Sequence, residues 1–168
     1  GRRADVAAIA DRLATGLGLE PHPEGGRYRQ LFRSGSIVTA TGRGVERAAL
    51  TSILFLLSKG EVSRWHRVLS DEAWHFHEGD PLELLVVDAE FAGAARHVLG
   101  RASDGNEPLA VVPAGAWQAA RPLGDYALVA CEVGPGFDFA DFVLLGDVPG
   151  EAERLRERGV SVEGVIPE

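Results

Sequence analysis

At 168 residues the chain has the length of one domain, and its 45% apolar and 25% charged residues are ordinary for a globular protein. A formal net charge of −8 argues against nucleic-acid binding, which needs a cationic face. No apolar run approaches the roughly 18 residues of a membrane span. Because Cys131 is the only cysteine, no disulfide framework exists within the chain. We therefore expect a cytoplasmic protein with neither a nucleic-acid nor a membrane partner.

The first predicted element is an amphipathic helix over about residues 4–17. Asp5 is its expected N-cap, and Gly16 and Gly18 are stop signals. Its apolar face would consist of Val6, Ile9, Ala10, Leu13 and Leu17. The paired glycines and prolines of "GLEPHPEGG" (18–26) predict a turn after this helix.

Short β-type runs follow, separated by turn residues and never by a helix-length segment. This pattern favours an antiparallel sandwich or barrel. Residues 34–47 are expected to form a long mobile loop, and a short helix and tail are expected over about 147–168. The predicted fold is one all-β barrel domain, with the barrel over about 19–145 and helical ends. The predicted strands are 27–33, 51–58, 63–69, 73–79, 82–88, 95–100, 109–113, 117–122, 126–133 and 142–146.

The stretch "RWHRVLSDEAWHFHEGDPLEL" (64–84) gathers three of the five histidines beside acidic residues. Alternate residues of a strand share a face. Arg64 and His66 would then share one side of their strand. On the next strand Glu72, Trp74 and Phe76 would face the barrel interior, and His75 and His77 would face outward.

Two motifs carry a family resemblance. In the first, His66 precedes Glu72, and Gly79 follows after six residues; in the second, "PAGAWQ" places Pro113, Gly115 and Gln118 at matching spacing. Together with the surrounding sequence from "HPEGGRYRQ" to "GFDFADF", these two stretches resemble, in altered form, the two motifs of the cupin superfamily. The likeness is to the branch called cupin 5, small proteins related to sugar-nucleotide epimerases. It implies a double-stranded β-helix jelly-roll barrel with an internal pocket, and usually a dimer.

Departures from the motifs bear on metal binding. Metal-binding cupins have histidines where this chain has Arg64, which cannot donate a lone pair, and Gln118, a poor ligand for the metals that imidazole favours. The resemblance therefore predicts that no metal cofactor is bound. An alternative stays open, in which a bulge flips the strand and a divalent metal supports oxygenase or lyase chemistry. Its ligands would come from His66, Glu72, His75, His77 and Gln118.

The leading functional hypothesis is a carbohydrate-type isomerase or epimerase. His66 would remove a proton beside a carbonyl, Glu72 would orient it, and Arg64 with Gln118 would steady the enolate oxygen. The alternative from another class is a non-catalytic metabolite-binding or sensing module. In either case the expected ligand is a small molecule, such as a sugar or sugar nucleotide. Further candidate contacts are Glu24, Trp74, Phe76, His75, His77 and Trp117, although tryptophans serve equally well as core filler.

A homodimer is also expected. Runs such as "TSILFLLS" and "ELLVVD" are apolar on both faces, and short helices cannot cover a jelly roll's outer surfaces.

Overall fold

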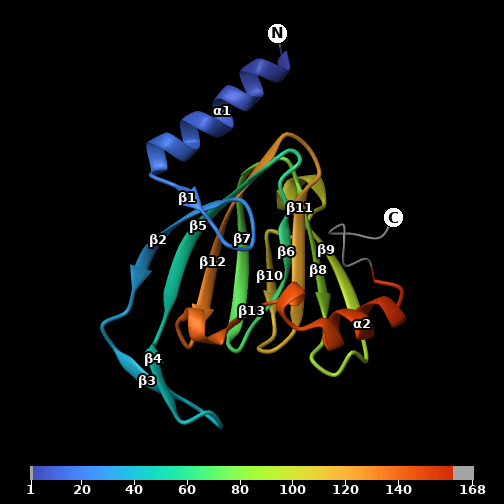
Figure 1. Cartoon of the computed structure of the whole chain (residues 1–168). Helices are drawn as coiled ribbons and strands as arrows, with labels where there is room; N and C mark the ends of the chain where they lie inside the picture. The colour runs from blue at the N-terminus through green and yellow to red at the C-terminus, as the bar shows by residue number, and fades with distance from the viewer. Residues whose placement is uncertain (1, 161–168) are drawn as a thin grey trace.

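The computed structural model of the chain describes residues 2–160. Two antiparallel sheets face each other across the core (Figure 1). The six-stranded sheet has the order β1 (Glu20–Pro21), β2 (Arg27–Arg33), β5 (Thr51–Ser58), β12 (Tyr126–Gly134), β7 (Asp71–Gly79) and β10 (Leu109–Val112). The five-stranded sheet has the order β13 (Phe142–Leu144), β6 (Ser63–Val68), β11 (Trp117–Pro122), β8 (Leu82–Val87) and β9 (Ala94–Leu99). The predicted all-β architecture is confirmed.

Successive side chains of a strand point to opposite faces of its sheet, and this alternation determines which side chains form the core between the two sheets. On β12, Val129 and Cys131 belong to this core, whereas Leu128 packs under the first helix on the opposite face. Phe55, Trp74 and other apolar side chains from both sheets complete it.

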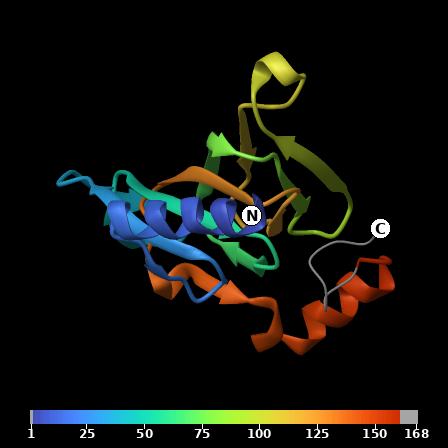
Figure 2. The ribbon, with the colours of Figure 1, turned by 90° about the horizontal axis from the view of Figure 1, so that it is seen from above.

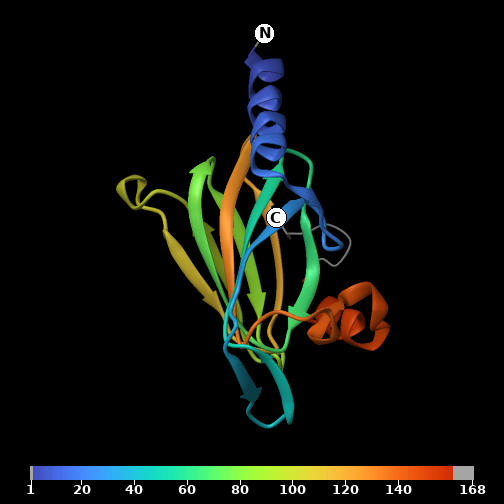
Figure 3. The same cartoon turned by 90° about the vertical axis from the view of Figure 1, so that its left-hand side faces the viewer.

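The helices cover other surfaces. α1 (Arg2–Leu17) lies at one end of the barrel, where Ala14 packs with Leu56 and Leu128 (Figures 1 and 3). α2 (Pro149–Glu157) packs on the outer face of the five-stranded sheet through a second cluster that includes Trp117 and Leu155. Seen from above, α2 and the excursion around η1 (Ala102–Asp104) protrude from different sides (Figure 2). Neither helix within the described range is long and apolar enough to cross a bilayer.

Two details of the sequence prediction need correction. Segment 34–47 is not a loop, because β3 (Ile37–Ala40) and β4 (Val45–Ala48) pair as a hairpin around a turn with positive φ at Gly42 and Gly44. The hairpin projects below the barrel (Figure 3). α1 begins at Arg2, so Asp5 lies in its first turn and is not the N-cap. The side chain of Val6 and the tail beyond residue 160 lie outside the described part of the chain.

Candidate functional site

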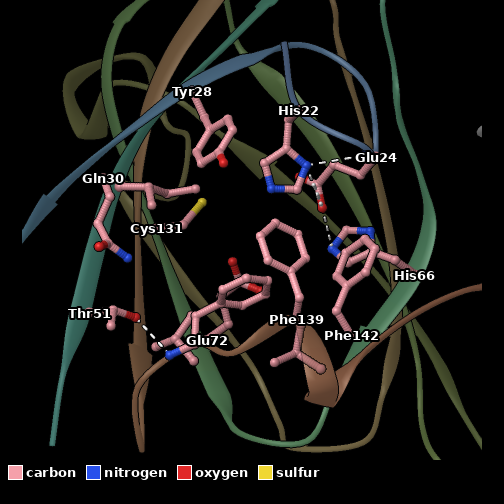
Figure 4. A pocket seen from close by; sticks show the side chains of 14 residues that line it. His22, Glu24, Tyr28, Gln30, Thr51, His66, Glu72, Cys131, Phe139 and Phe142 are labelled. Atoms are coloured by element: carbon pink, nitrogen blue, oxygen red, sulfur yellow. Dashed lines mark hydrogen bonds and ion pairs between the residues drawn. The ribbon is translucent and has the colours of Figure 1, made fainter. Parts of the chain in front are cut away.

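A cavity of about 240 Å³ lies between the two sheets (Figure 4). Polar side chains and aromatic rings line its wall together with the aliphatic side chains of Ile53, Val68 and Val133. Strands β2, β5, β6, β7, β12 and β13 contribute side chains, as do the turn before β2 and the segment before β13. The lining residues are His22, Glu24, Tyr28, Gln30, Thr51, Ile53, His66, Val68, Glu72, Cys131, Val133, Phe137, Phe139 and Phe142.

The predicted turn before β2 is a structural part of this site. Its backbone closes through hydrogen bonds from the His22 amide to Gly26 and from the Gly25 amide to His22, each 3.0 Å. Gly25 has φ of 116°, and a Cβ there would lie 1.9 Å from the carbonyl oxygen of Val62. Only glycine fits this close approach. The turn thereby packs against the start of β6 and directs Glu24 into the cavity.

Arg64 lies outside the cavity, contrary to the predicted role in steadying an enolate. Its side chain is exposed and bends back along the turn, where Nε donates to the Glu24 carbonyl at 3.3 Å and Nη2 donates to the Pro23 carbonyl. Its backbone amide donates to the same Glu24 carbonyl at 2.7 Å. Arg64 therefore fixes the turn that carries Glu24.

His66 is buried, with 1% exposure, and both of its ring nitrogens are occupied. Nδ1 lies 2.7 Å from the Arg64 carbonyl oxygen, and Nε2 lies 2.9 Å from Oε2 of Glu24. Both partners accept hydrogen bonds, so both nitrogens donate, which is the imidazolium form. Burial opposes this charge, but the Glu24 carboxylate outweighs it and raises the pKa of His66 to about 9. At neutral pH His66 is therefore a poor proton acceptor, and the base role assigned to it needs revision.

Glu24 and His22 complete this corner of the cavity. Burial raises the pKa of Glu24, but the charge and hydrogen bond of His66 act more strongly together, so the net shift is downward. Burial lowers the pKa of His22, and its Nδ1 accepts the Glu24 backbone amide at 3.1 Å. His22 is thus neutral with its proton on Nε2. The corner holds a neutralised ion pair beside a neutral imidazole.

Glu72 is the titratable group of the opposite wall. It comes from the inner face of β7 and is 7% exposed. Burial raises its pKa to about 7, against the opposing charge of His66 and a hydrogen bond from Gln118. Cys131 also lines the cavity, and burial together with the nearby Glu72 charge keeps the pKa of its thiol well above the usual value. The cavity therefore holds a carboxyl that exchanges its proton near neutral pH beside an un-ionised thiol.

Gln118 and Trp74 lie behind Glu72. Nε2 of Gln118 donates to Oε1 of Glu72 at 2.8 Å, and the Trp74 indole donates to Oε1 of Gln118 at 2.9 Å. Neither residue lines the cavity. The structure thus places both predicted ligand contacts one layer behind the wall.

An aromatic cover closes the remaining side of the cavity. Phe137, Phe139 and Phe142 pack edge to face, with ring centroids 4.9 to 6.0 Å apart. Phe139 lines the cavity although it is 53% exposed, so its ring separates the cavity from solvent. Asp141 anchors this segment to the β3–β4 hairpin through Arg43 at 3.0 Å and Arg47 at 2.9 Å.

Four other predicted contacts lie away from the cavity. Trp117 packs outside the barrel under α2, because it occupies the outer face of β11. His75 and His77 occupy the outer face of β7, and Nε2 of His75 lies 3.5 Å from Glu132. Phe76 packs against the core without lining the cavity.

The flipped strand register that the metal-binding alternative requires is therefore wrong, since His75 and His77 face away from His66. Among residues 2–160, no group of three or more His, Cys, Asp or Glu side chains is arranged to hold a metal ion.

Sequence reasoning missed several wall residues. Tyr28 and Gln30 share a face two residues apart on β2, a signal that alternation could have revealed. His22 lies in the predicted Pro/Gly turn, a position that is compatible with a surface turn or with the mouth of a pocket, and its burial depends on where the turn docks. The role of the 137–142 segment as a cover likewise depends on tertiary contacts with the hairpin.

Comparisons with known proteins agree with this architecture. Residues 11–145 match the profile of Cupin_5, described as "Cupin superfamily (DUF985)". A solved protein from Shewanella oneidensis is 34% identical, covers 94% of this chain and 97% of its own, and superposes with a TM-score of 0.79. A hypothetical protein from Leishmania major is 32% identical, covers 89% of this chain and 97% of its own, with a TM-score of 0.77.

More distant structures share the fold alone. Oxalate decarboxylase from Bacillus subtilis is 18% identical with a TM-score of 0.57, and the match covers 85% of this chain and 35% of that enzyme. No curated protein sequence matches the chain significantly. The family profile spans most of the chain, and the two closely matching structures cover nearly all of it, so the jelly-roll prediction is confirmed and the chain belongs to the Cupin_5 family of the cupin superfamily.

Proposed function

We propose that this cupin binds a small hydroxy-carbonyl compound of monosaccharide size in its barrel and isomerises or epimerises it by proton transfer through Glu72. The observation that carries the proposal is the position of Glu72 in the cavity wall with a pKa of about 7. A carboxyl that exchanges its proton near the working pH suits general acid and base catalysis.

The size of the cavity limits the ligand. Its volume of about 240 Å³ is below the roughly 300–1,000 Å³ of pockets that take drug-sized molecules. A cavity of this volume accommodates a single sugar ring or an open-chain sugar. The nucleotide part of a sugar nucleotide would have to extend beyond it. Tyr28, Gln30 and Thr51 offer polar groups to hydroxyls, and the aromatic cover offers an apolar surface to the C–H face of a sugar.

The proposed reaction assigns new roles to the histidines. The ionised Glu72 takes a proton from the carbon beside the carbonyl, and the electron pair of that C–H bond moves to give an enolate. The neutral His22 donates from Nε2 to the developing oxygen. In isomerisation, Glu72 returns the proton to the former carbonyl carbon, while the hydroxyl proton of the adjacent carbon passes to the former carbonyl oxygen and the new carbonyl forms at that adjacent carbon. In epimerisation, a solvent proton adds to the opposite face of the same carbon, and Glu72 releases the proton that it took to water. His66 stays protonated and holds the charge of Glu24 in place.

The test is incorporation of solvent deuterium into a panel of keto- and aldo-sugars, followed by NMR. We expect exchange at a carbon beside the carbonyl with the wild-type protein and its loss in Glu72→Gln. Glu132→Gln is the matched control, because Glu132 lies on the neighbouring strand with its side chain outside the barrel. Exchange that persists in Glu72→Gln would remove the assigned base.

A non-catalytic binding module is the second candidate, and the closed hydrogen-bond network favours it. Both nitrogens of His66 and both amide atoms of Gln118 already have protein partners, an arrangement typical of a preformed pocket. Thermal-shift screening joined to product analysis separates the two candidates. A sugar that raises the melting temperature but is recovered unlabelled from deuterated solvent supports binding alone.

A further inference from the structure

The hydrogen bonds behind Glu72 form a chain with a fixed direction. An indole N–H can only donate, so the atom of Gln118 that lies 2.9 Å from Trp74 must be the amide oxygen. The amide NH2 group is then forced toward Oε1 of Glu72, at 2.8 Å. Trp74 and Gln118 are both fully buried, so water does not compete for these bonds.

We infer that Trp74 is a positioning residue for Glu72: its indole locks the Gln118 amide so that Oε1 of the carboxyl always accepts a hydrogen bond and Oε2 alone exchanges a proton with the ligand. A carboxyl oxygen that accepts from an amide NH2 cannot at the same time donate a proton along that line. The proton of Glu72, when present, therefore resides on Oε2. This inference rests on the proposed role of Glu72 and adds the residue that determines which of its oxygens reacts.

Removal of the indole N–H would release this lock. The amide could then turn and present its oxygen to Glu72, an arrangement that requires the carboxyl to be protonated. The other groups that act on Glu72 are His66, Glu24 and Cys131. They come from β6, the turn before β2 and β12, whereas the Trp74 indole nitrogen donates to Gln118. Cys131 lies opposite Trp74 in the sheet, so Gln118→Met, which leaves that packing in place, separates the effect carried by Gln118 from a change at Cys131.

The chain contains a matched control for this effect. Trp117 adjoins Gln118 on β11 and is also fully buried, but it faces the outer cluster under α2. Its indole nitrogen has no hydrogen-bond partner among the described residues. Trp117→Phe therefore removes the same atoms from a buried site and leaves the hydrogen bonds from Trp74 through Gln118 to Glu72 in place.

The experiment follows the indole ¹⁵N–H signals of the wild-type protein by NMR between pH 5 and pH 9, with no substrate present. We expect the Trp74 signal to shift with a midpoint near 7 that also appears in the labelled carboxyl carbon of Glu72, and to stop shifting in Glu72→Gln. The Trp117 signal should not follow this midpoint. A Trp74 signal that ignores the titration of Glu72 would overturn the inference.

Variants test the direction of the effect. In Trp74→Phe the midpoint of Glu72 should rise by about one pH unit, the usual size for losing one hydrogen bond to the charged form, whereas Trp117→Phe should leave it near the wild-type value. Gln118→Met, which keeps Trp74 but removes the donor, should raise the midpoint in the same direction and serves if Trp74→Phe does not fold. Equal midpoints in the two tryptophan variants would contradict the inference. Because no sugar is used, failure of the proposed reaction leaves this test intact.

Discussion

Oε2 of Glu24, on the turn before β2, lies 2.9 Å from Nε2 of His66 on β6, and this buried ion pair forms one corner of the cavity. Neither group would remain charged there alone, because burial penalises an isolated charge. The pair explains why His66 stays protonated, whereas burial raises the pKa of Glu72, on the other wall, to about 7.

The ion pair predicts a specific pH dependence of stability. The pKa of His66 rises from 6.5 unfolded to about 9 folded, so its stabilising contribution is complete below pH 6.5 and is lost as pH rises through 9. Between pH 7 and pH 10 the free energy of unfolding should fall by an amount on the order of 2 kcal/mol from this group. Urea unfolding should show a much smaller fall in Glu24→Gln. Glu20→Gln, an exposed change on β1, should retain the wild-type dependence.

Glu72→Gln should stabilise the protein at alkaline pH. The folded pKa of about 7 lies above the reference value of 4.5, so the contribution of Glu72 to stability is present below pH 4.5 and is lost as pH rises through 7. At pH 8 the neutral amide avoids the cost of a buried carboxylate, and we expect a gain of about 1–3 kcal/mol in the free energy of unfolding. At pH 5 the gain should shrink. A variant that is less stable than wild type at both pH values would show that the carboxylate is better compensated than we infer.

The aromatic cover should control access to Cys131. This residue is the only cysteine and lines the cavity behind the cover, so its reaction with a thiol reagent reports entry. Phe139→Ala should speed modification by methyl methanethiosulfonate on the order of tenfold, because a ring that separates the cavity from solvent is lost. Phe32→Ala, which removes an equally exposed ring on β2, is the control. Equal rates in both variants would mean that the reagent enters by another route.

The expected homodimer stays a prediction, and the six-stranded sheet offers the surface for it. Phe32, Leu109 and Val111 are exposed on this sheet, whereas their neighbours Ala110 and Val112 face the core. A partner that covers this face would remove these side chains from water. Light scattering should give a mass of twice 17.9 kDa at micromolar concentration. A Val111→Asp variant should shift the mass toward the monomer, and a wild-type mass of one chain at every concentration would contradict the prediction.

The sequence by itself determined much of the fold. Successive side chains of a strand point to opposite faces, so alternating apolar and polar residues predict both the strands and the faces that they turn to the core. That rule placed Glu72 and Trp74 inside and His75 and His77 outside, as observed. It failed for Arg64, which lies at the start of β6, where a register shift against β11 lets the side chain turn outward.

The chemistry of the site was decided only by tertiary structure. Local sequence does not reveal that a Pro/Gly turn docks on β6 and delivers Glu24 to His66, since this contact depends on the close approach of Gly25 to Val62. Protonation follows from such contacts: the same carboxyl chemistry gives Glu24 a lowered pKa beside an imidazolium and Glu72 a raised pKa in a buried wall. The sequence identified the acidic residues and the histidine of the site, whereas burial and charge pairing in the folded protein determine which of these groups carries a proton at neutral pH.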